Sequence, residues 1–352
     1  MEPCRLWLTL SVLVVASTAI RSQTAQTHRF IPRTFYNTFS GSHPPALRIK
    51  PGDRVITKTI DASGTDWDGT SVASGPNPQT GPFFVEGAEP GDTFAVQLDR
   101  IWPNRGRGVS GQVVAPHVVD PSFASELPTR DPDGDWWSLD LERGTARLEA
   151  PPPGLESLGE LSLAPMLGCF GVAPPRGQAI STATSGAHGG NMDYRGFREG
   201  VTVFFPVFVE GALLHVGDGH ALQGDGEIVG TGIEVSMDVE VTVEVLKGKR
   251  ISWPRAEDET FVMAVGNARP LDQAVQHATT ELMRLLEEDY GLDHRASSAL
   301  LGQCIRYDVG NVFDPAYTMV AKVEKRLLPV NRTGRSGHAR WSDQRNESVT
   351  NA

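Results

Sequence analysis

Residues 239–245 alternate strictly between apolar and polar side chains. Valine occupies every second position, and glutamate or threonine lies between the valines. In an extended chain this pattern puts the valines on one face, so it predicts a β-strand with one buried and one solvated face. The 37 glycines and 25 prolines of the chain suit many tight turns between short strands. These features together predict a mainly β fold.

Further strands are predicted by alternation or by β-branched and aromatic residues, at 46–50, 55–60, 93–101, 201–208 and 227–235. The period changes near the C-terminus. Apolar residues recur at helical spacing between Leu271 and Leu286, and Gly291 is placed to end the helix. A second helix is predicted at about 296–307, and extended chain returns at 313–323.

Length, composition and charge limit the possible partners. A chain of 352 residues, 39% hydrophobic and 21% charged, is typical of a folded globular protein. We divide its folded part into a mainly β region at 26–250 and a smaller α/β part at 251–330. The net charge of −11 argues against a nucleic-acid partner, because phosphate binding needs clustered lysine and arginine.

The two ends of the chain differ from this folded part. Residues 6–20 form an apolar run that follows Arg5 and precedes several small residues, which predicts a secretory signal at 1–25 and an exported, periplasmic or extracellular protein. The alternative is a membrane anchor, but a span needs roughly 20 apolar residues. Residues 331–352 are polar with almost no apolar content, which predicts a disordered tail.

The three cysteines form no known motif. Cys4 lies in the predicted signal, and Cys169 and Cys304 could pair in an exported protein, although two small buried residues are the simpler interpretation. The chain has neither C-x-x-C spacing nor a G-x-S-x-G elbow. Ser185 near His188 is the nearest hint of serine chemistry, so the sequence offers no obvious covalent nucleophile.

Residues 188–234 concentrate the side chains that carry chemistry, held between glycines. Glycine-rich turns let the backbone approach a ligand closely. Asp218 and His220 are two residues apart, as are Asp225 and Glu227, so each pair shares one face of an extended chain. Imidazole and carboxylate groups that converge on one surface suit a metal site or an acid/base pair.

Several ordered segments resemble signatures of the acetamidase/formamidase family. They are TGPFFVEGAEPGD at 80–92, GCFGVAP at 168–174, HGGNMD at 188–193 and GDGHALQGDGE at 217–227. The resemblance implies an acetamidase/formamidase-like fold of the β-sandwich or barrel kind with a smaller α/β C-terminal part. It also implies a likeness in activity, the hydrolysis of short amides such as formamide and acetamide to a carboxylate and ammonia, and a homo-oligomer.

Amide hydrolysis must activate water, stabilise an oxyanion and protonate a poor leaving group. A metal ion can do the first two. The candidate metal ligands are Asp61, which matches a position where the family also carries aspartate, and His188, Asp193 and His220. Histidine and carboxylate ligands fit zinc, whereas an oxygen-dominated set would favour calcium or magnesium.

Glu227 is the candidate general acid/base, because it follows a Gly-Asp-Gly turn at the start of a predicted strand. His188 is a second catalytic candidate, and Glu86, at another strand end, is a supporting one. Glu234 has opposite parity to Glu227, so both can face one site only if Gly230 or another glycine makes a bulge.

These candidates also have purely structural interpretations. His188 could be a turn histidine bonded to backbone, Asp193 could cap a turn, and His220 could lie in a turn between strands. Two other functions stay open. One is a non-catalytic exported module that binds a metal or another ligand, and the other is a hydrolase of a larger or cyclic amide whose pocket is reshaped by residues 103–160.

Overall fold

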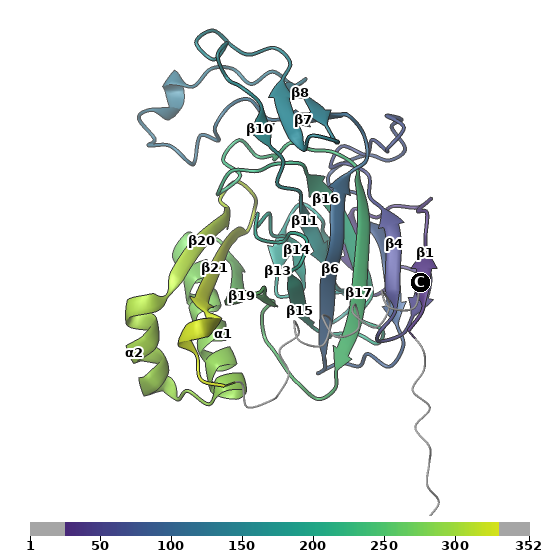
Figure 1. Ribbon diagram of the computed structural model, residues 1–352, viewed down its shortest axis with the longest axis vertical. Coiled ribbons are helices and arrows are strands. Elements are labelled where there is room, and N and C mark those ends of the chain that lie inside the picture. Colours follow the sequence, from purple (N-terminus) through teal and green to yellow (C-terminus); the bar gives the residue numbers. More distant parts are fainter. Residues whose placement is uncertain (1–24, 331–352) are drawn as a thin grey trace, which may run out of the picture.

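The structure, a computed structural model, describes residues 25–330. Two large β-sheets face each other, two helices flank the larger sheet, and a smaller sheet lies beyond one end (Figure 1). The predicted disordered tail lies outside the described residues, as does the predicted signal apart from Ala25. The prediction of a mainly β fold with a smaller α/β C-terminal part is confirmed.

The larger sheet has nine strands in the order β1-β4-β17-β6-β15-β18-β19-β21-β20. Its strands are β1 (Thr27–Arg29), β4 (Arg54–Lys58), β6 (Thr93–Pro103), β15 (Thr202–Pro206), β17 (Met237–Leu246), β18 (Arg255–Glu257), β19 (Phe261–Ala268), β20 (Arg306–Asn311) and β21 (Tyr317–Glu324). β17 contains the alternating valines. Val239 and Val241 are fully buried, whereas Glu240 between them forms an ion pair with Arg54 on the outer face.

The second sheet has six strands in the order β13-β14-β11-β16-β5-β3. Its strands are β3 (Leu47–Ile49), β5 (Thr80–Val85), β11 (Met166–Gly171), β13 (Ser185–Gly186), β14 (Gly189–Asn191) and β16 (Leu214–His220). A separate two-stranded sheet pairs β2 (Thr38–Ser40) with β12 (Ala179–Ser181). The six-stranded sheet therefore carries most of the segments that the family signatures cover.

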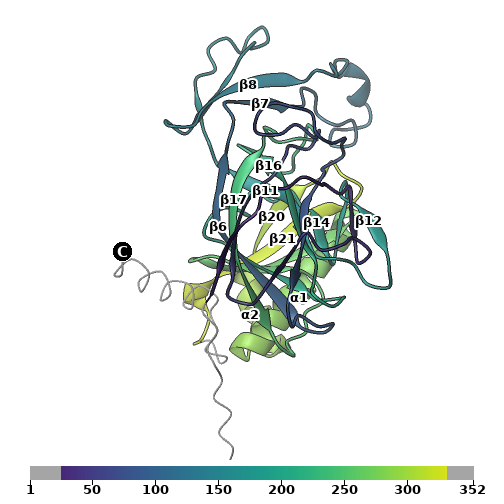
Figure 2. The same ribbon diagram turned by 90° about the vertical axis from the view of Figure 1, so that its right-hand side faces the viewer.

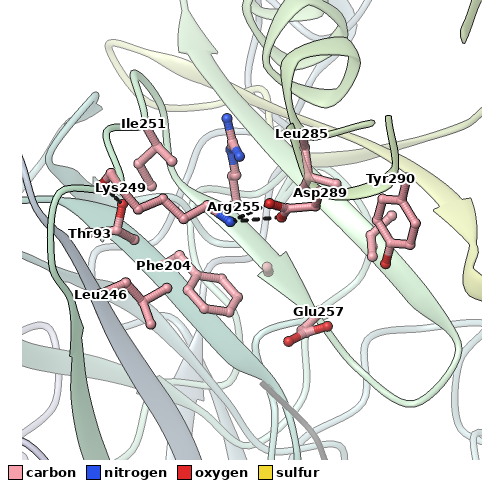
Figure 3. Close-up of a pocket in the computed structure, with 12 residues that line it drawn as sticks. Thr93, Phe204, Leu246, Lys249, Ile251, Arg255, Glu257, Leu285, Asp289 and Tyr290 are labelled. Carbon is pink, nitrogen blue, oxygen red and sulfur yellow. Dashed lines mark hydrogen bonds and ion pairs between the residues drawn. The ribbon is translucent and has the colours of Figure 1, made fainter. Parts of the chain in front are cut away.

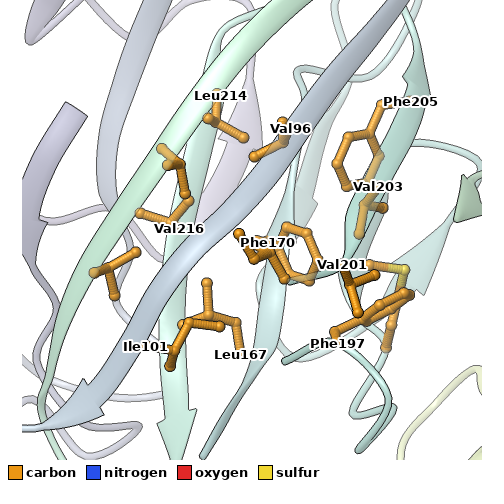
Figure 4. Packing of buried hydrophobic residues seen from close by; sticks show 14 of the residues in the cluster. Val96, Ile101, Leu167, Phe170, Phe197, Val201, Val203, Phe205, Leu214 and Val216 are labelled. Carbon is orange, nitrogen blue, oxygen red and sulfur yellow. The ribbon is translucent and has the colours of Figure 1, made fainter. Parts of the chain in front are cut away.

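The main core fills the space between the two large sheets (Figure 4). Phe170 of β11 packs edge to face against Phe197 and Phe205, with ring centroids 5.3 and 5.5 Å apart. Val96 of β6 and Val216 of β16 face the same interior from opposite sheets and are fully buried. Burial of each such side chain contributes about 1.5–3 kcal/mol, so this interior holds the two sheets together.

Helices α1 (Leu271–Tyr290) and α2 (His294–Cys304) cover the outer face of β19 and β21. Their apolar side chains form a second cluster with those strands, in which Leu282 and Leu286 are fully buried. As predicted, α1 ends at Gly291, whose φ of +68° suits glycine. The second helix ends earlier than predicted, because Arg306 already begins strand β20.

A pocket of about 70 Å³ lies where α1 meets β15 and β18 (Figure 3). Lys249 and Asp289 form an ion pair of 2.7 Å at its wall. Arg255 extends away from Glu257 and donates through Nε to Glu281 Oε1 at 2.7 Å. Arg255 and Glu281 are both buried, so this ion pair ties α1 to the sheet inside the protein.

The segment between β6 and β11, residues 104–165, forms a layer that we name the cap. It contains β7 (Arg107–Ser110), β8 (Asp135–Asp140), β9 (Thr145–Leu148), β10 (Leu161–Ser162) and a short 3-10 helix (Ala124–Glu126). A second 3-10 helix, Lys325–Leu327, follows β21. Two perpendicular views place the cap beyond the same end of the large sheets (Figures 1 and 2). The cap is therefore built on a four-stranded sheet in the order β10-β9-β8-β7.

The predicted strand at 227–235 is not formed. Residues 227–233 form turns and bends, and Gly226, Glu227 and Gly230 have φ values of +83°, +50° and +80°, outside the range of extended chain. The chain therefore turns here instead of extending, and the parity argument against Glu227 and Glu234 sharing a site does not apply. Within residues 25–330, both cysteines have free thiols, and no helix has the length and apolar character of a membrane span.

Candidate active site

One histidine and two aspartates converge at the end of β16, next to the cap. Asp218 and His220 belong to β16, and Asp193 follows β14. A Cβ atom added to Gly168 would lie 2.3 Å from Asp193 Oδ1, 2.8 Å from Asp218 Oδ2 and 3.1 Å from His220 Cε1. Glycine at position 168 therefore leaves room at the centre of the site.

The backbone around this centre is strained. Asp193, Asp218 and Glu227 have φ values of +42°, +57° and +50°, which residues with side chains rarely adopt. Such strain collects at functional sites, where surrounding contacts maintain it. The N–H groups of Met192 and Asp193 both donate to the Gly168 carbonyl, at 3.0 and 3.1 Å. These bonds turn the chain after β14 so that Asp193 reaches the site.

Gln223 fixes the orientation of the His220 ring. Its Nε2 donates to the Asp193 carbonyl at 2.6 Å, so its Oε1 faces His220 Nδ1 at 2.7 Å and accepts from it. His220 Nε2 then faces Glu234 Oε1 at 2.9 Å and Asp218 Oδ1 at 3.4 Å. Metal-binding histidines are commonly held in this way, by a fixed partner on the second ring nitrogen.

The loop at 224–234 brings Glu227 and Glu234 to the same site, and both are buried. A Cβ on Gly232 would lie 2.6 Å from His220 Cγ, so glycine there allows the loop to pass close to the ring. The loop is anchored to the cap by two backbone hydrogen bonds. The N–H of Val109 donates to the Glu234 carbonyl at 3.2 Å, and the N–H of Glu234 donates to the Val109 carbonyl at 2.8 Å.

Asparagine side chains frame the carboxylates. Asn77 Nδ2 donates to Asp218 Oδ2 at 3.1 Å and to Asn191 Oδ1 at 2.6 Å. Asn191 Nδ2 donates in turn to Asp314. Asn311 Nδ2 donates to the carboxyl groups of Asp314, Asp193 and Glu227. Amide groups thus provide N–H donors to carboxylates without adding positive charge.

Burial and mutual repulsion shift the protonation of the site. Burial is the largest cause that raises the pKa of Asp193 and Glu227, and it raises the pKa of Glu234 to about 7. Burial lowers the pKa of His220, but the negative charges of Glu234 and Asp218 outweigh it and hold that pKa well above its usual value. The site therefore retains protons near neutral pH.

Two overlapping groups of side chains could hold a metal ion. They are Asp193–His220–Glu227 and Asp218–His220–Glu234, and in each group one ligand atom per residue lies within 4.8 Å of the others. Two of their buried polar atoms, Asp193 Oδ1 and Glu234 Oε2, have no hydrogen-bond partner, and His220 Nε2 contacts only the carboxylates of Glu234 and Asp218. Buried polar atoms without partners are costly, so these residues fit a bound cation.

His188 lies in neither group. It is buried between β13 and β14, and its ring contacts Phe39 edge to face at 5.1 Å between centroids. Burial lowers the pKa of His188 to about 4, so the imidazole is neutral at pH 7. Its Nε2 has no hydrogen-bond partner. His215 contacts the same Phe39 ring at 5.2 Å.

Asp61 and Glu86 also lie outside the two groups. Asp61 is buried; its Oδ1 accepts from the N–H groups of Ser63 and Thr65 at 3.0 and 2.8 Å, and its Oδ2 forms an ion pair with Arg105 of the cap. Glu86 is exposed and follows the end of β5 that is farther from His220. Of the candidate site residues, the structure brings together Asp193, His220 and Glu227.

Five residues that contact or frame the site were not predicted from the sequence: Asn77, Gly168, Gln223, Asn311 and Asp314. Gly168 opens the family signature at 168–174, which was a usable signal. Asn311 ends strand β20 and Asp314 follows it, with no glycine-rich run around them. The backbone hydrogen bonds that join this segment to Gly226 bring both residues to the site.

Comparison with known proteins supports a common family. Residues 166–281 match the model of the acetamidase/formamidase family. The chain is 30% identical over 298 residues to an acetamidase of Mycolicibacterium smegmatis, which covers 67% of this chain and 71% of the relative. A formamidase of Methylophilus methylotrophus is 25% identical over 274 residues, which covers 60% of this chain and 64% of the relative.

Solved structures share the fold. An acetamidase from Yersinia enterocolitica aligns with a TM-score of 0.75 and 31% identity, covering 87% of this chain and 94% of that one. A predicted acetamidase/formamidase from Thermoanaerobacter tengcongensis aligns with a TM-score of 0.73 and 28% identity, covering 86% of this chain and 97% of that one. The fold and site thus define a β-sandwich protein with a buried histidine–carboxylate centre. The chain belongs to the acetamidase/formamidase family, and the resemblance seen in the sequence is confirmed.

Proposed function

We propose that the protein hydrolyses the C–N bond of short linear carboxamides, of the formamide and acetamide type, to a carboxylate and ammonia. The observation that carries this proposal is the convergence of four buried carboxyl groups on His220, in a chain whose relatives are named acetamidase and formamidase. The carboxyl groups are those of Asp193, Asp218, Glu227 and Glu234.

Metal assistance is part of the proposal. A bound divalent ion would supply Lewis-acid chemistry, acidifying a water molecule and polarising the amide carbonyl. His220 would hold it through Nε2, together with the carboxylates of either group. Mixed nitrogen and oxygen donors favour zinc, whereas calcium prefers oxygen alone. Gln223 holds the His220 ring in the orientation that this requires.

Glu227 would move the protons. Hydrolysis takes one proton from the attacking water and delivers one to the departing nitrogen, so that ammonia leaves in place of an amide anion. A buried carboxyl group whose pKa is raised can both accept and donate a proton near neutral pH. Glu227 also belongs to one possible ligand group, so its two roles must be separated by experiment.

The test is ammonia release from formamide, acetamide, propionamide and a cyclic amide, before and after chelation and after zinc is restored. Glu227→Gln should abolish release. If its zinc content is unchanged, Glu227 acts on protons; if zinc is lost, Glu227 is a ligand and proton transfer falls to Glu234. Glu86→Gln is the matched control, because Glu86 is exposed at the far end of β5, and it should retain full activity.

No release from any amide by folded, zinc-loaded protein would reject the proposal and favour the non-catalytic binding module. Release from the cyclic amide alone would favour the hydrolase of larger or cyclic amides. Release that survives complete removal of metal would reject the metal-assisted mechanism while keeping the amidase.

We also propose that the protein is exported after removal of residues 1–25 and that it forms a homo-oligomer. The apolar run at 6–20 supports export, and likeness to the family supports assembly. N-terminal sequencing of protein from the medium or periplasm tests the first proposal, and light scattering during size-exclusion chromatography tests the second. Uncleaved protein retained in the cytoplasm, or a monomer at micromolar concentration, would reject them respectively.

A further inference from the structure

The amide of Asn311 lies among three carboxyl groups that come from separate segments. Its Nδ2 is 2.7 Å from Asp193 Oδ2, 2.8 Å from Glu227 Oε2 and 2.6 Å from Asp314 Oδ2. Asn311 itself is fully buried. A primary amide carries only two N–H hydrogens, so the three carboxyl groups share one donor and are held as a unit.

The orientation of this amide is fixed by its other end. Asn311 Oδ1 accepts from the N–H groups of Phe313 and Asp314, at 2.7 and 3.0 Å. A reversed amide would lose both bonds and would point its oxygen at three carboxyl oxygens. Nδ2 therefore faces the carboxyl groups.

The backbone of Asn311 is anchored to the loop that carries Glu227. The N–H of Val312 donates to the Gly226 carbonyl at 2.9 Å, and the N–H of Gly226 donates to the Val309 carbonyl at 3.1 Å. The donor and one of its acceptors are thus attached to a single rigid junction between β20 and the loop. A side chain held in this way can orient its partners more firmly than one on a free loop.

The bond from Asn311 determines which oxygen of Asp193 is available to a ligand. Its Oδ2 is engaged by Asn311, whereas its Oδ1 is buried without a partner and lies nearest to the space over Gly168. We infer that Asn311 is a positioning residue that presets Asp193 and Glu227 for the cation site. This inference rests on the proposed function for its metal, but Asn311 is assigned by its own hydrogen bonds.

The experiment titrates zinc alone into metal-free, full-length protein by calorimetry. Asn311→Leu keeps the number and branching of the side-chain heavy atoms and removes the donor and the acceptor, and it should weaken zinc binding by about 10–100-fold, as loss of outer partners of metal ligands typically does. Asn311→Ser keeps one O–H donor and an acceptor for the turn, so its loss should be intermediate. The serine variant keeps the test valid if the leucine variant does not fold.

Asn267→Leu is the matched control. Asn267 is also buried, donates to the Gly186 carbonyl at 2.9 Å and accepts from Thr318 Oγ1 at 2.9 Å, but it touches none of the three carboxyl groups. The Asn267→Leu variant should lose about as much thermal stability as Asn311→Leu. Its affinity for zinc should equal that of the unaltered protein. Equal zinc affinity in the Asn311 variants and the unaltered protein would overturn the inference.

Ammonia release from acetamide, measured with saturating zinc, separates this inference from the proposed function. If the unaltered protein binds zinc and hydrolyses no amide, the proposed function fails and the affinity series still decides the role of Asn311. If the unaltered protein hydrolyses acetamide without binding zinc, the amidase stands and the inference fails. A fall in kcat for Asn311→Ser at saturating zinc, with KM unchanged, would further support positioning of Glu227.

Discussion

Gly168 shows that a single absent side chain can define a site. Asp193, Asp218 and His220 approach one another only because no Cβ atom lies between them. Glycine is used here for close approach, which is distinct from its use in turns. The site therefore depends on the absence of a side chain at Gly168 as much as on the residues that could bind a metal ion.

Gly168→Ala should therefore disable the site without unfolding the protein. The added methyl group would lie 2.3 Å from Asp193 Oδ1, so the carboxylate must move away from its position beside His220. We expect at least a 100-fold fall in kcat/KM for acetamide, since small misplacements of catalytic groups cost about that much. Calorimetric zinc titration and ammonia release measure the effect.

Gly302→Ala is the control for this substitution. Nothing lies within 4 Å of a Cβ at Gly302, which is in helix α2, so alanine there should leave activity unchanged and stabilise the helix by about 1 kcal/mol. Full activity in Gly168→Ala would show that the space over Gly168 is not used.

Protonation of the buried carboxyl groups should make stability depend on pH. The folded pKa of Glu234 is raised to about 7 by burial, so the folded state binds its proton more tightly than the unfolded state. The contribution of Glu234 to the stability of the metal-free protein should therefore fall as pH rises from about 5 to 7, and the raised pKa of His220 acts in the same direction at higher pH. The lowered pKa values of the buried His188 and His215 act in the opposite direction below about pH 6.5, so the effect of Glu234 is read by comparison with a variant. Zinc, which competes with these protons, should bind more tightly as pH rises.

Thermal unfolding across this pH range, with and without zinc, tests the prediction. Glu234→Gln should remove the part of the pH dependence that belongs to Glu234, because glutamine has no proton to release, so the unfolding midpoint of the metal-free variant should fall less, or rise more, between about pH 5 and 7 than that of the unaltered protein. The same pH dependence in the variant and in the unaltered protein would contradict the pKa shift of Glu234.

The sequence predicted some of these residues and not others for a physical reason. Asp193, His220 and Glu227 lie in glycine-rich segments that match family signatures, so local pattern was enough. Asn311 and Asp314 carry no such pattern, because their roles arise from the bridge to Gly226 and from side-chain bonds to distant segments. A local pattern cannot report a contact made between residues so far apart in the chain.

At the scale of elements, the periodic segments were predictable. β17 and α1 were expected because their valines and leucines recur at periods of two and 3.6 residues, and both form. The expected strand at 227–235 failed because Glu227 adopts a left-handed conformation that its residue type does not signal. Positive φ at a residue with a side chain depends on tertiary contacts, which periodicity does not contain.

The attachment of α1 to the large sheet gives a prediction at this scale. Arg255→Met would leave the buried Glu281 with only the half-exposed Arg284 at 3.5 Å as a charged partner, and we expect a loss of about 3 kcal/mol in the free energy of unfolding. The double variant Arg255→Met with Glu281→Leu should recover most of this loss, because two apolar side chains can replace a buried ion pair. Urea unfolding measures both variants, and a loss below about 1 kcal/mol in the single variant would show that the pair is solvated.

At the scale of the whole molecule, the cap is attached to the site and not only placed near it. Besides the pairing of Val109 with Glu234, the N–H of Ala115 donates to the Ile228 carbonyl at 2.8 Å, and His117 Nε2 bonds the Val312 carbonyl at 3.0 Å. The cap therefore supports both the loop of Glu227 and the turn after Asn311.

Replacing residues 113–132 with a short Gly-Ser linker should show how much the activity depends on this support from the cap. The linker would keep β7 and β8 but remove the contacts of Ala115 and His117, and we expect kcat/KM for acetamide to fall at least about tenfold. The unfolding midpoint should change little, because the main core lies between the large sheets. Leu155→Ser, at an exposed position of the cap, is the control; unchanged activity in the linker variant would limit the cap to substrate selection.

The separation in sequence of the residues that build the site has a consequence during synthesis. Asn77, Gly168, Asp193, His220 and Asn311 come together only after both sheets have paired, and contacts of such long range form late in folding. A chain still on the ribosome, with residues from 309 onward not yet released, would lack the amide that bonds Asp193 and Glu227 and the backbone bonds that anchor the loop of Glu227. Full affinity for metal ions should therefore appear only once the C-terminal strands are complete.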